Sequence, residues 1–332
     1  MDKKIEKNML RDRAEKLPEV TDEMYENVNE EYREFVSEYI SSQNHSPATK
    51  RQYKSGLRQF GFFLYDSLNN KRMCKLTKRD MLRYMSFLKD RGMSSSGIGF
   101  KKACVSSLMN YIENFIADEE EDYKTFRNLT RGLPAIPKNA VYEKIKVTHE
   151  EYTEMMDALK SDDNYLGMAW LATAFNVGAR LSEIIQFKTS IFDKEFPENN
   201  SYIMSHNVRL KGSGDDGKIE PYMINREAYD YMKLWVDNRG YESEYIFTTK
   251  YGKNYQMSAS WAEYFCQEVL TYVLHRRINP HLFKASCITY LLEQGVKLEL
   301  VSKYVAHHEN VATTIAHYDL RDFEEEKNNI FK

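Results

Sequence analysis

A stretch with two prolines near the middle of the chain divides the sequence into two parts. Residues 133–147, LPAIPKNAVYEKIKV, contain Pro134 and Pro137 and show no apolar repeat of helical period, a combination typical of a linker. The chain has 332 residues, so the parts on both sides are long enough to enclose separate apolar cores. The sequence therefore predicts two domains.

The part before the linker is predicted to be a bundle of helices, because apolar residues recur in it at helical spacing. Ser46 before Pro47 is a typical helix start, with the serine as N-cap and the proline at the first helical position. Thr77 is in position to cap the next helix. We expect a charged arm over residues 1–30 and a helical domain over residues 31–132.

The part after the linker is predicted to be mainly helical, with a small β-sheet or hairpin. Thr148 and Glu151 match a capping box, which marks the start of the second domain. Short apolar runs and a glycine-rich turn, GSGDDG, indicate strands at 202–204, 208–210 and 219–224. We expect this domain over residues 148–320, followed by a tail over residues 321–332.

The composition excludes several classes of protein. A hydrophobic fraction of 42% with 24 Tyr and 17 Phe indicates a globular chain rather than a disordered one. No apolar run is long enough for a membrane span, and the charged N-terminal residues do not match a secretory signal, so we expect a cytoplasmic protein. The four Cys are scattered, which predicts free thiols with no disulfide frame and no zinc site.

The charge of the chain is concentrated in one region. The net charge is −3, but residues 46–102 contain 14 Lys and Arg against 3 Asp, an excess of 11 positive charges. One interpretation is a solvated helix surface; the other is a surface that binds a polyanion such as nucleic acid. The excess extends over several predicted helices, which favours nucleic acid. The candidate DNA-contacting residues are Lys50, Arg51, Lys54, Arg58, Lys101 and Lys102.

Four separated stretches of the second domain carry residues suited to phosphate chemistry. Each is a weak signal alone, because an Arg–Glu pair on a helix or a Lys beside a turn is usually a surface feature. Three histidines near the C-terminus also raise the alternative of a metal site, but no carboxylate or Cys lies at ligand spacing. The stretches are NVGARLSEI with Arg180, RLKGSGDDGKIE with Lys211, PHLFK with His281 and Lys284, and YVAHHENVATTIAHYDL with His307, His308, His317 and Tyr318.

The order of these residues resembles the tyrosine recombinase (phage integrase) family. VGARLSEI resembles the family's T-G-x-R-x-S-E motif, with Val177 in place of the threonine. HLFKAS resembles its H-x-L-R motif, with Lys284 in place of the arginine. AHH followed by Thr313 and Thr314 resembles its L-G-H motif and threonine pair. The resemblance covers roughly residues 31–320 and implies a two-domain fold, a helical core-binding domain followed by a catalytic-type domain.

The resemblance also implies a chemistry for each matched position. Arg180 would clamp the non-bridging oxygens of a phosphodiester, and Lys211 would be the general acid. His281 and His308 would donate hydrogen bonds, and Tyr318 would attack to form a 3′-phosphotyrosine. The implied partner is double-stranded DNA in a bacterial host cell, with no metal or nucleotide cofactor. The C-terminal tail is a candidate element for homo-oligomerisation.

Two departures from the family pattern concern the site itself. Lys284 offers a point charge on a flexible stem where the family has a planar guanidinium that grips two oxygens. His307 stands where the family usually has glycine, and we expect an imidazole there to crowd His308. Tyr318 is also open to a second interpretation, since Val311 and Ile315 share its helix face and the tyrosine could be a packed core residue.

These departures lead to two functional hypotheses. The favoured one is a DNA-binding protein that keeps the recombinase fold but has weakened or lost strand cleavage, such as the integrase-like lysogeny repressors of SPβ-type phages. The alternative is an active site-specific tyrosine recombinase.

Overall fold

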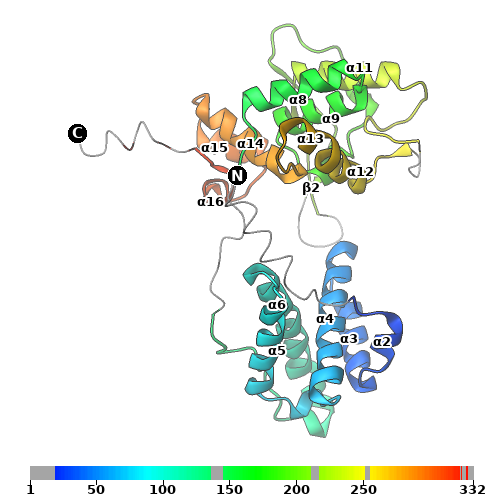
Figure 1. The fold of residues 1–332 in the computed structure, drawn as a ribbon, viewed down its shortest axis with the longest axis vertical. Helices are drawn as coiled ribbons and strands as arrows, with labels where there is room; N and C mark the ends of the chain where they lie inside the picture. The colour runs from blue at the N-terminus through cyan, green and yellow to red at the C-terminus, as the bar shows by residue number, and fades with distance from the viewer. Residues whose placement is uncertain are drawn as a thin grey trace. The chain divides into compact units, whose positions relative to one another are not determined.

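The computed structural model describes residues 19–135, 145–210, 217–250, 255–321, 323 and 327. These residues fall into two compact units that divide at residues 143 and 144, and each unit is described separately below (Figure 1). The N-terminal unit is helical. Its elements are α2 (Asp22–Glu26), α3 (Glu30–Ser42), α4 (Pro47–Leu68), η1 (Met73–Lys75), α5 (Lys78–Asp90), α6 (Ser95–Tyr111), η2 (Ile112–Ile116), α7 (Ala117–Glu119) and η3 (Glu121–Tyr123).

Helices α4 and α5 begin at the caps that the sequence predicts. The Ser46 hydroxyl accepts a hydrogen bond from the Thr49 backbone N–H, and Pro47 occupies the first position of α4. Thr77 and Asp80 form a reciprocal capping box at the start of α5. α4 ends where Asn69 adopts a left-handed backbone conformation with φ of 51°.

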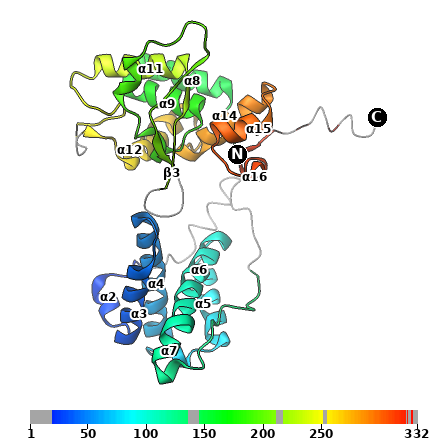
Figure 2. The same ribbon diagram turned by 180° about the vertical axis from the view of Figure 1, so that it is seen from behind.

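The core of the N-terminal unit forms where α3 and α6 pack on α4, with α5 beside α6 (Figure 2). Tyr32 on α3 is fully buried, and its hydroxyl donates to the Leu57 carbonyl of α4 at 2.7 Å. Two glycines of α4 permit this close approach: Gly61 lies under the Tyr32 ring and Gly56 lies against Cys104 of α6. The apolar faces that the sequence indicated therefore meet in one core.

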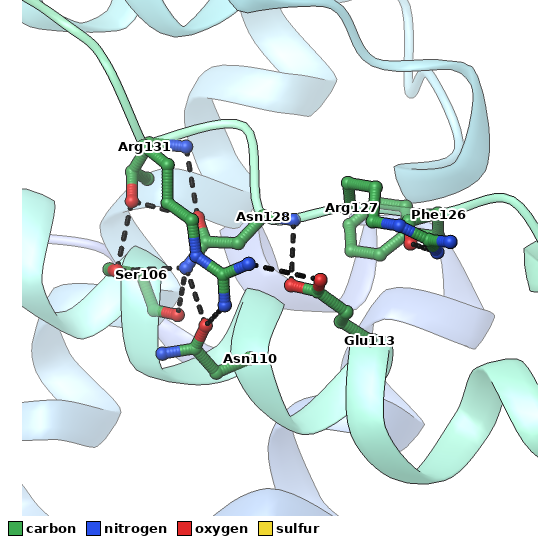
Figure 3. Close-up of polar contacts among 8 residues, drawn as sticks. Ser106, Asn110, Glu113, Phe126, Arg127, Asn128 and Arg131 are labelled. Atoms are coloured by element: carbon green, nitrogen blue, oxygen red, sulfur yellow. Dashed lines mark hydrogen bonds and ion pairs between the residues drawn. The ribbon is translucent and has the colours of Figure 1, made fainter.

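The segment that follows η3 is bound to α6 by a polar network (Figure 3). The Asn128 side-chain amide donates to the Ser106 carbonyl at 3.0 Å and to the Asn110 side chain at 2.8 Å. Its backbone N–H donates to Glu113, which also pairs with Arg131. Because Asn128 is only 3% exposed, these bonds satisfy polar groups that burial would otherwise leave unpaired.

The C-terminal unit combines helices with two small antiparallel strand pairs. Helices α8, α9 and α11 lie side by side in both views (Figures 1 and 2). The elements are α8 (His149–Ser161), α9 (Tyr165–Val177), α10 (Leu181–Ile184), η4 (Thr189–Asp193), β1 (Tyr202–Met204), β2 (Val208–Leu210), β3 (Lys218–Glu220), β4 (Met223–Asn225), α11 (Arg226–Asn238), α12 (Ala259–Tyr264), η6 (Phe265–Leu270), α13 (Thr271–Leu274), α14 (Pro280–Glu293), α15 (Leu298–Leu300), η7 (Val301–Val305) and α16 (Val311–Tyr318).

The strand expected at 219–224 is in fact two strands. β3 pairs with β2, whereas β4 pairs with β1, and the chain changes partner at Pro221 and Tyr222. Proline has no N–H to donate to a strand ladder, so a continuous strand through Pro221 is disfavoured. The mainly helical fold with a small hairpin is confirmed.

Helix α9 is the centre of the second core. Its residues are almost all buried, and Trp170 packs edge-to-face on Phe283 of α14. α9 ends at Gly178, whose φ is 67° and whose missing side chain leaves room for Val305. A Cβ atom at Gly178 would lie 2.8 Å from Val305 Cγ1, so this glycine lets the segment before Arg180 approach η7.

No helix within the described ranges is both long enough and apolar enough to cross a membrane. Residues 1–18 of the predicted arm, much of the predicted linker and most of the predicted tail lie outside the described residues.

The close packing at Gly61 gives a test of the first core. A Cβ at Gly61 would lie 2.6 Å from the Tyr32 ring, so Gly61→Ala should destabilise the protein by about 1–3 kcal/mol. Gly99→Ala on α6 is the matched control, since a Cβ there meets nothing within 4 Å and should stabilise the helix by about 0.5–1 kcal/mol. Urea unfolding followed by circular dichroism measures both. Equal stability of the two variants would contradict this packing.

Candidate functional site

The C-terminal unit has a pocket of about 290 Å³ that gathers four of the predicted site residues. Arg180, His281, Lys284 and Tyr318 all line it, although they come from three separate stretches of the sequence. The fifth, His308, adjoins the pocket because its ring lies 4.7 Å from the Tyr318 ring, centroid to centroid. Lys211 lies outside the described residues.

A buried carboxylate, Glu183, holds Arg180 in place. Arg180 caps α10, and Glu183 on that helix accepts hydrogen bonds from its backbone N–H at 2.6 Å and from its Nη1 at 3.0 Å. Glu183 is fully buried and also accepts from the Tyr222 hydroxyl at 2.6 Å. The Arg180–Glu183 pair is therefore an internal anchor rather than the surface pair that its spacing alone suggested.

The charge of Glu183 is maintained despite its burial. Burial raises the pKa of the Glu183 carboxyl, but the Lys284 charge, the Tyr222 hydrogen bond and the Arg180 backbone and charge together lower it below its usual value. A carboxylate that stays ionised inside the protein fixes the guanidinium of Arg180, whose side chain is 22% exposed at the pocket.

Lys284 is buried in the wall of the pocket. Its residue is 3% exposed, and its ammonium donates to the Ala306 carbonyl at 2.9 Å. Burial and the nearby Arg180 charge lower the pKa of the Lys284 ammonium to about 7. Near neutral pH this lysine is therefore protonated only part of the time, and its hydrogen bond goes to the loop that carries His307.

His307 does not crowd His308, contrary to the expectation from sequence. Its backbone has φ of 53°, the left-handed region that favours glycine. This conformation directs the imidazole to Glu220 of β3, with 2.6 Å between Nδ1 and Oε2, and the ring packs edge-on against Tyr222 at 4.3 Å. The side chain is 5% exposed.

His308 is a half-buried, neutral imidazole. Burial and the charges of Lys284 and Arg180 lower its pKa to about 4. Its Nδ1 lies 2.9 Å from the Thr314 hydroxyl, which itself donates to Ser302. In this arrangement Nδ1 donates and Nε2 is an acceptor, with no hydrogen-bond partner in the described part of the chain. The histidines at 307 and 308 thus face different partners, and no metal-binding group of three His, Cys, Asp or Glu occurs among the described residues.

Tyr318 ends α16 and is partly buried. Its backbone carbonyl accepts from the Thr289 hydroxyl of α14 at 2.8 Å, which places the end of α16 beside the pocket. Ile315 on the same helix is 52% exposed, so this face of α16 is not a closed apolar core. The tyrosine packs against a small cluster around Ile288 and Leu292 while also lining the pocket.

The predicted DNA-contacting residues of the N-terminal unit differ in their surroundings. Arg51 and Lys54 of α4 are exposed and Lys50 is half-buried, as are Lys101 and Lys102 of α6. Lys101 lies beside Gly56, so these parts of α4 and α6 are adjacent.

Some of the positive charge of this unit is neutralised internally. The Arg58 guanidinium donates to the Val20 carbonyl and pairs with Asp22 at 2.7 Å, so it holds the α2 region against α4. Arg72 pairs with Glu31 and Asp122. The local positive excess is therefore smaller than a count along residues 46–102 indicates.

Two groups in the site were not identified from the sequence. Glu220 ends β3 and Tyr222 lies between β3 and β4, the two strands that the sequence merged. Nothing in their local pattern connects them to a histidine more than 80 residues later. Glu183 was noted, but its burial depends on contacts with Tyr222 that a spacing rule does not contain.

Comparisons with known proteins identify the class. The sequence profile of the phage integrase family matches residues 146–325. The chain is 63% identical, over the full length of both, to the SPbeta prophage-derived recombinase-like protein YomM of Bacillus subtilis (strain 168). It is 23% identical to the tyrosine recombinase XerC of Staphylococcus carnosus (strain TM300), covering 81% of this chain and 85% of that protein.

Solved structures agree on the fold. The post-cleavage complex of the XerH site-specific recombinase with palindromic difH substrate superposes with a TM-score of 0.70 at 15% identity, covering 96% of this chain and 99% of that one. The protein belongs to the phage integrase family and has the tyrosine recombinase fold.

The depressed pKa of Lys284 predicts a pH-dependent contribution to stability. The folded protein releases this proton near pH 7, whereas the unfolded chain keeps it to about pH 10.4, so the contribution of Lys284 to the stability of the wild type rises with pH between these values. The stability of Lys284→Met relative to wild type should therefore be greatest at pH 6 and fall above pH 7, by up to about 1.4 kcal/mol per pH unit. Urea unfolding at pH 6, 7, 8 and 9 measures this difference.

Lys303→Met is the matched control, because Lys303 is exposed on η7. Its stability difference from wild type should not change over this range. If the stability difference between Lys284→Met and wild type did not change with pH, the buried ammonium would keep its proton over the whole range.

Proposed function

We propose that the protein is a sequence-specific double-stranded DNA-binding protein whose strand cleavage is weakened or lost, and that it acts as a transcriptional repressor of a phage or mobile element. The observation that carries the proposal is the position of Lys284. Its ammonium is buried against the Ala306 carbonyl. The family resemblance implies a phosphate-gripping arginine at this position of the sequence.

A lysine in place of the family arginine is expected to slow strand cleavage more than it weakens phosphate binding. An arginine fork can hold two phosphate oxygens in fixed geometry, whereas an ammonium is a point charge. Loss of one preorganised donor to the transition state costs about 10²–10³ in rate. Here the loss is compounded, because the Lys284 pKa of about 7 leaves part of the population uncharged. Arg180 remains available to a bound phosphate.

DNA binding is proposed to use exposed and half-buried cations of the N-terminal unit together with Arg180. Lys50, Arg51 and Lys54 on α4 and the Lys101–Lys102 pair on α6 supply the phosphate contacts. Arg58 is left out, because its guanidinium holds Val20 and Asp22. The XerH comparison, a complex of a site-specific recombinase with its palindromic difH substrate, supports this partner.

The second candidate is an active tyrosine recombinase. It is supported by the meeting of Arg180, His281 and Tyr318 in one pocket, and by the recombinase-like description of the Bacillus subtilis relative. In that case Tyr318 would form the 3′-phosphotyrosine and Lys211 would protonate the leaving oxygen.

A covalent-adduct assay separates the two functions. A duplex selected by the protein from a random pool is nicked so that cleavage traps the protein on DNA. Wild type should give at least about 100-fold less adduct than Lys284→Arg, since the arginine restores the missing donor. Tyr318→Phe is the background control. Efficient wild-type adduct that Tyr318→Phe abolishes would establish the recombinase and overturn the repressor proposal.

The salt dependence of DNA binding tests the proposed contacts. Each phosphate contact contributes about 0.9 to the slope of log K against log salt, so Arg51→Ala and Lys54→Ala should each reduce the slope by about one. Lys160→Ala on α8 removes the same charge outside the proposed contacts and is the control. Unchanged slopes for Arg51→Ala and Lys54→Ala would exclude α4 from the DNA interface.

A further inference from the structure

We propose that His307 and Glu220 form a tether that holds the β2–β3 hairpin to the loop before α16, so that His307 is a positioning residue rather than a DNA contact. The proposal goes beyond the function given above, and it joins two segments that neither the fold class nor the family motifs connect. It rests on the geometry on both sides of the bond.

The loop side of the tether is fixed independently of Glu220. The preceding residue, Ala306, is fully buried, and its carbonyl accepts from the Lys284 ammonium. The following residue, His308, donates its backbone N–H to the Ser302 carbonyl at 3.0 Å. His307 is thus held between two anchored neighbours, and its left-handed backbone, with φ of 53°, aims the side chain away from His308.

The imidazole is confined on two sides. Nδ1 lies 2.6 Å from Glu220 Oε2, and the ring lies edge-on to Tyr222, which is itself bonded to Glu183. A non-glycine residue in the left-handed region costs free energy, and a buried imidazole costs more when it is unpaired. The bond from Nδ1 to Glu220 offsets part of these costs, while Nε2 has no hydrogen-bond partner among the described residues.

The hairpin side of the tether lies at the base of β3. Glu220 is opposite Val208 in the strand register and also pairs with Lys218 at 2.8 Å. The carboxylate is 32% exposed, so its position depends on these two partners more than on packing. The paired strands are Val208–Leu210 and Lys218–Glu220, and Lys211 follows the first of them in the sequence.

The charges around His307 come from several elements. Glu220 on β3 and Glu183 on α10 attract its protonated form, whereas Lys284 on α14 disfavours that form. His308 is the next residue in the chain, and a positive charge on either imidazole disfavours protonation of the other. A neutral His307 can still donate from Nδ1 to the carboxylate, so the tether does not require protonation of the ring.

Hydrogen exchange of the free protein tests the tether, and because no DNA is present its outcome does not depend on the proposed function. The substitution His307→Gly removes the imidazole and so breaks the tether, while glycine still suits the positive φ at this position. We expect the hairpin amides at 208–210 and 218–220 to exchange at least about tenfold faster, while the amides of α9 keep their wild-type rates. Glu220→Ala should give the same increase, and the double variant should show no further increase, since both substitutions break one bond.

Two controls isolate the bond. His275→Gly replaces another histidine of left-handed φ, 49°, that is exposed at the end of α13, and it should leave the hairpin unchanged. Lys218→Ala removes only the second partner of Glu220 and should have a smaller effect than Glu220→Ala. If His307→Gly fails to fold, His307→Asn serves instead, because asparagine tolerates this backbone conformation but is too short to reach the carboxylate.

Chemical rescue separates positioning from general loss of packing. Added imidazole should fill the space left in His307→Gly and restore hairpin protection, but it should not restore Glu220→Ala, which lacks the acceptor. Wild-type exchange rates in His307→Gly, an equal effect of His275→Gly, or rescue of Glu220→Ala by imidazole would each overturn the proposal.

Discussion

The buried carboxylate of Glu183 is the interaction on which the rest of the site depends. It receives hydrogen bonds from Arg180 and Tyr222 and lies in the field of Lys284. A buried charge needs such partners, because removal of one leaves an uncompensated ion in the interior. Arg180 is held directly by this group, and Tyr222 supports the ring of His307. One acidic side chain therefore organises residues from α10, the β3–β4 connection and the loop before α16.

The cations of the pocket have unequal roles. Arg180 reaches the pocket and keeps its charge, since its pairing with Glu183 outweighs the effect of burial and raises its pKa. Lys284 is turned towards the backbone, and His308 is neutral near physiological pH. The pocket thus offers an anion much less positive charge than a count of its basic residues indicates. This arrangement fits a site that holds a phosphate more readily than it stabilises the added charge of a cleavage transition state.

Local rules predicted much of the fold, and the order of motifs singled out four of the residues that line the pocket. The starts of α4, α5 and α8 follow from Ser46, Thr77 and Thr148, because a cap acts over three or four residues. Arg180, His281, Lys284 and Tyr318 line one pocket, and the chemistry that the resemblance implies for them stays a prediction.

Other features depended on partners distant in sequence. The direction of the His307 side chain is set by its contact with Glu220. The Arg58 side chain is held by its hydrogen bond to Val20 and its ion pair with Asp22. The break at Pro221 reflects two competing strand partners, which the apolar pattern of 219–224 does not distinguish.

The burial of Lys284 has a consequence for the energetics of ligand binding. A phosphate in this pocket would favour the ammonium form and raise a pKa that is about 7 in the free protein. Binding would then draw a proton from the solvent, so the observed heat would depend on the ionisation enthalpy of the buffer. A family arginine, charged at every accessible pH, would show no such proton uptake. The single replacement at position 284 therefore makes occupancy of the pocket an acid–base event as well as an electrostatic one.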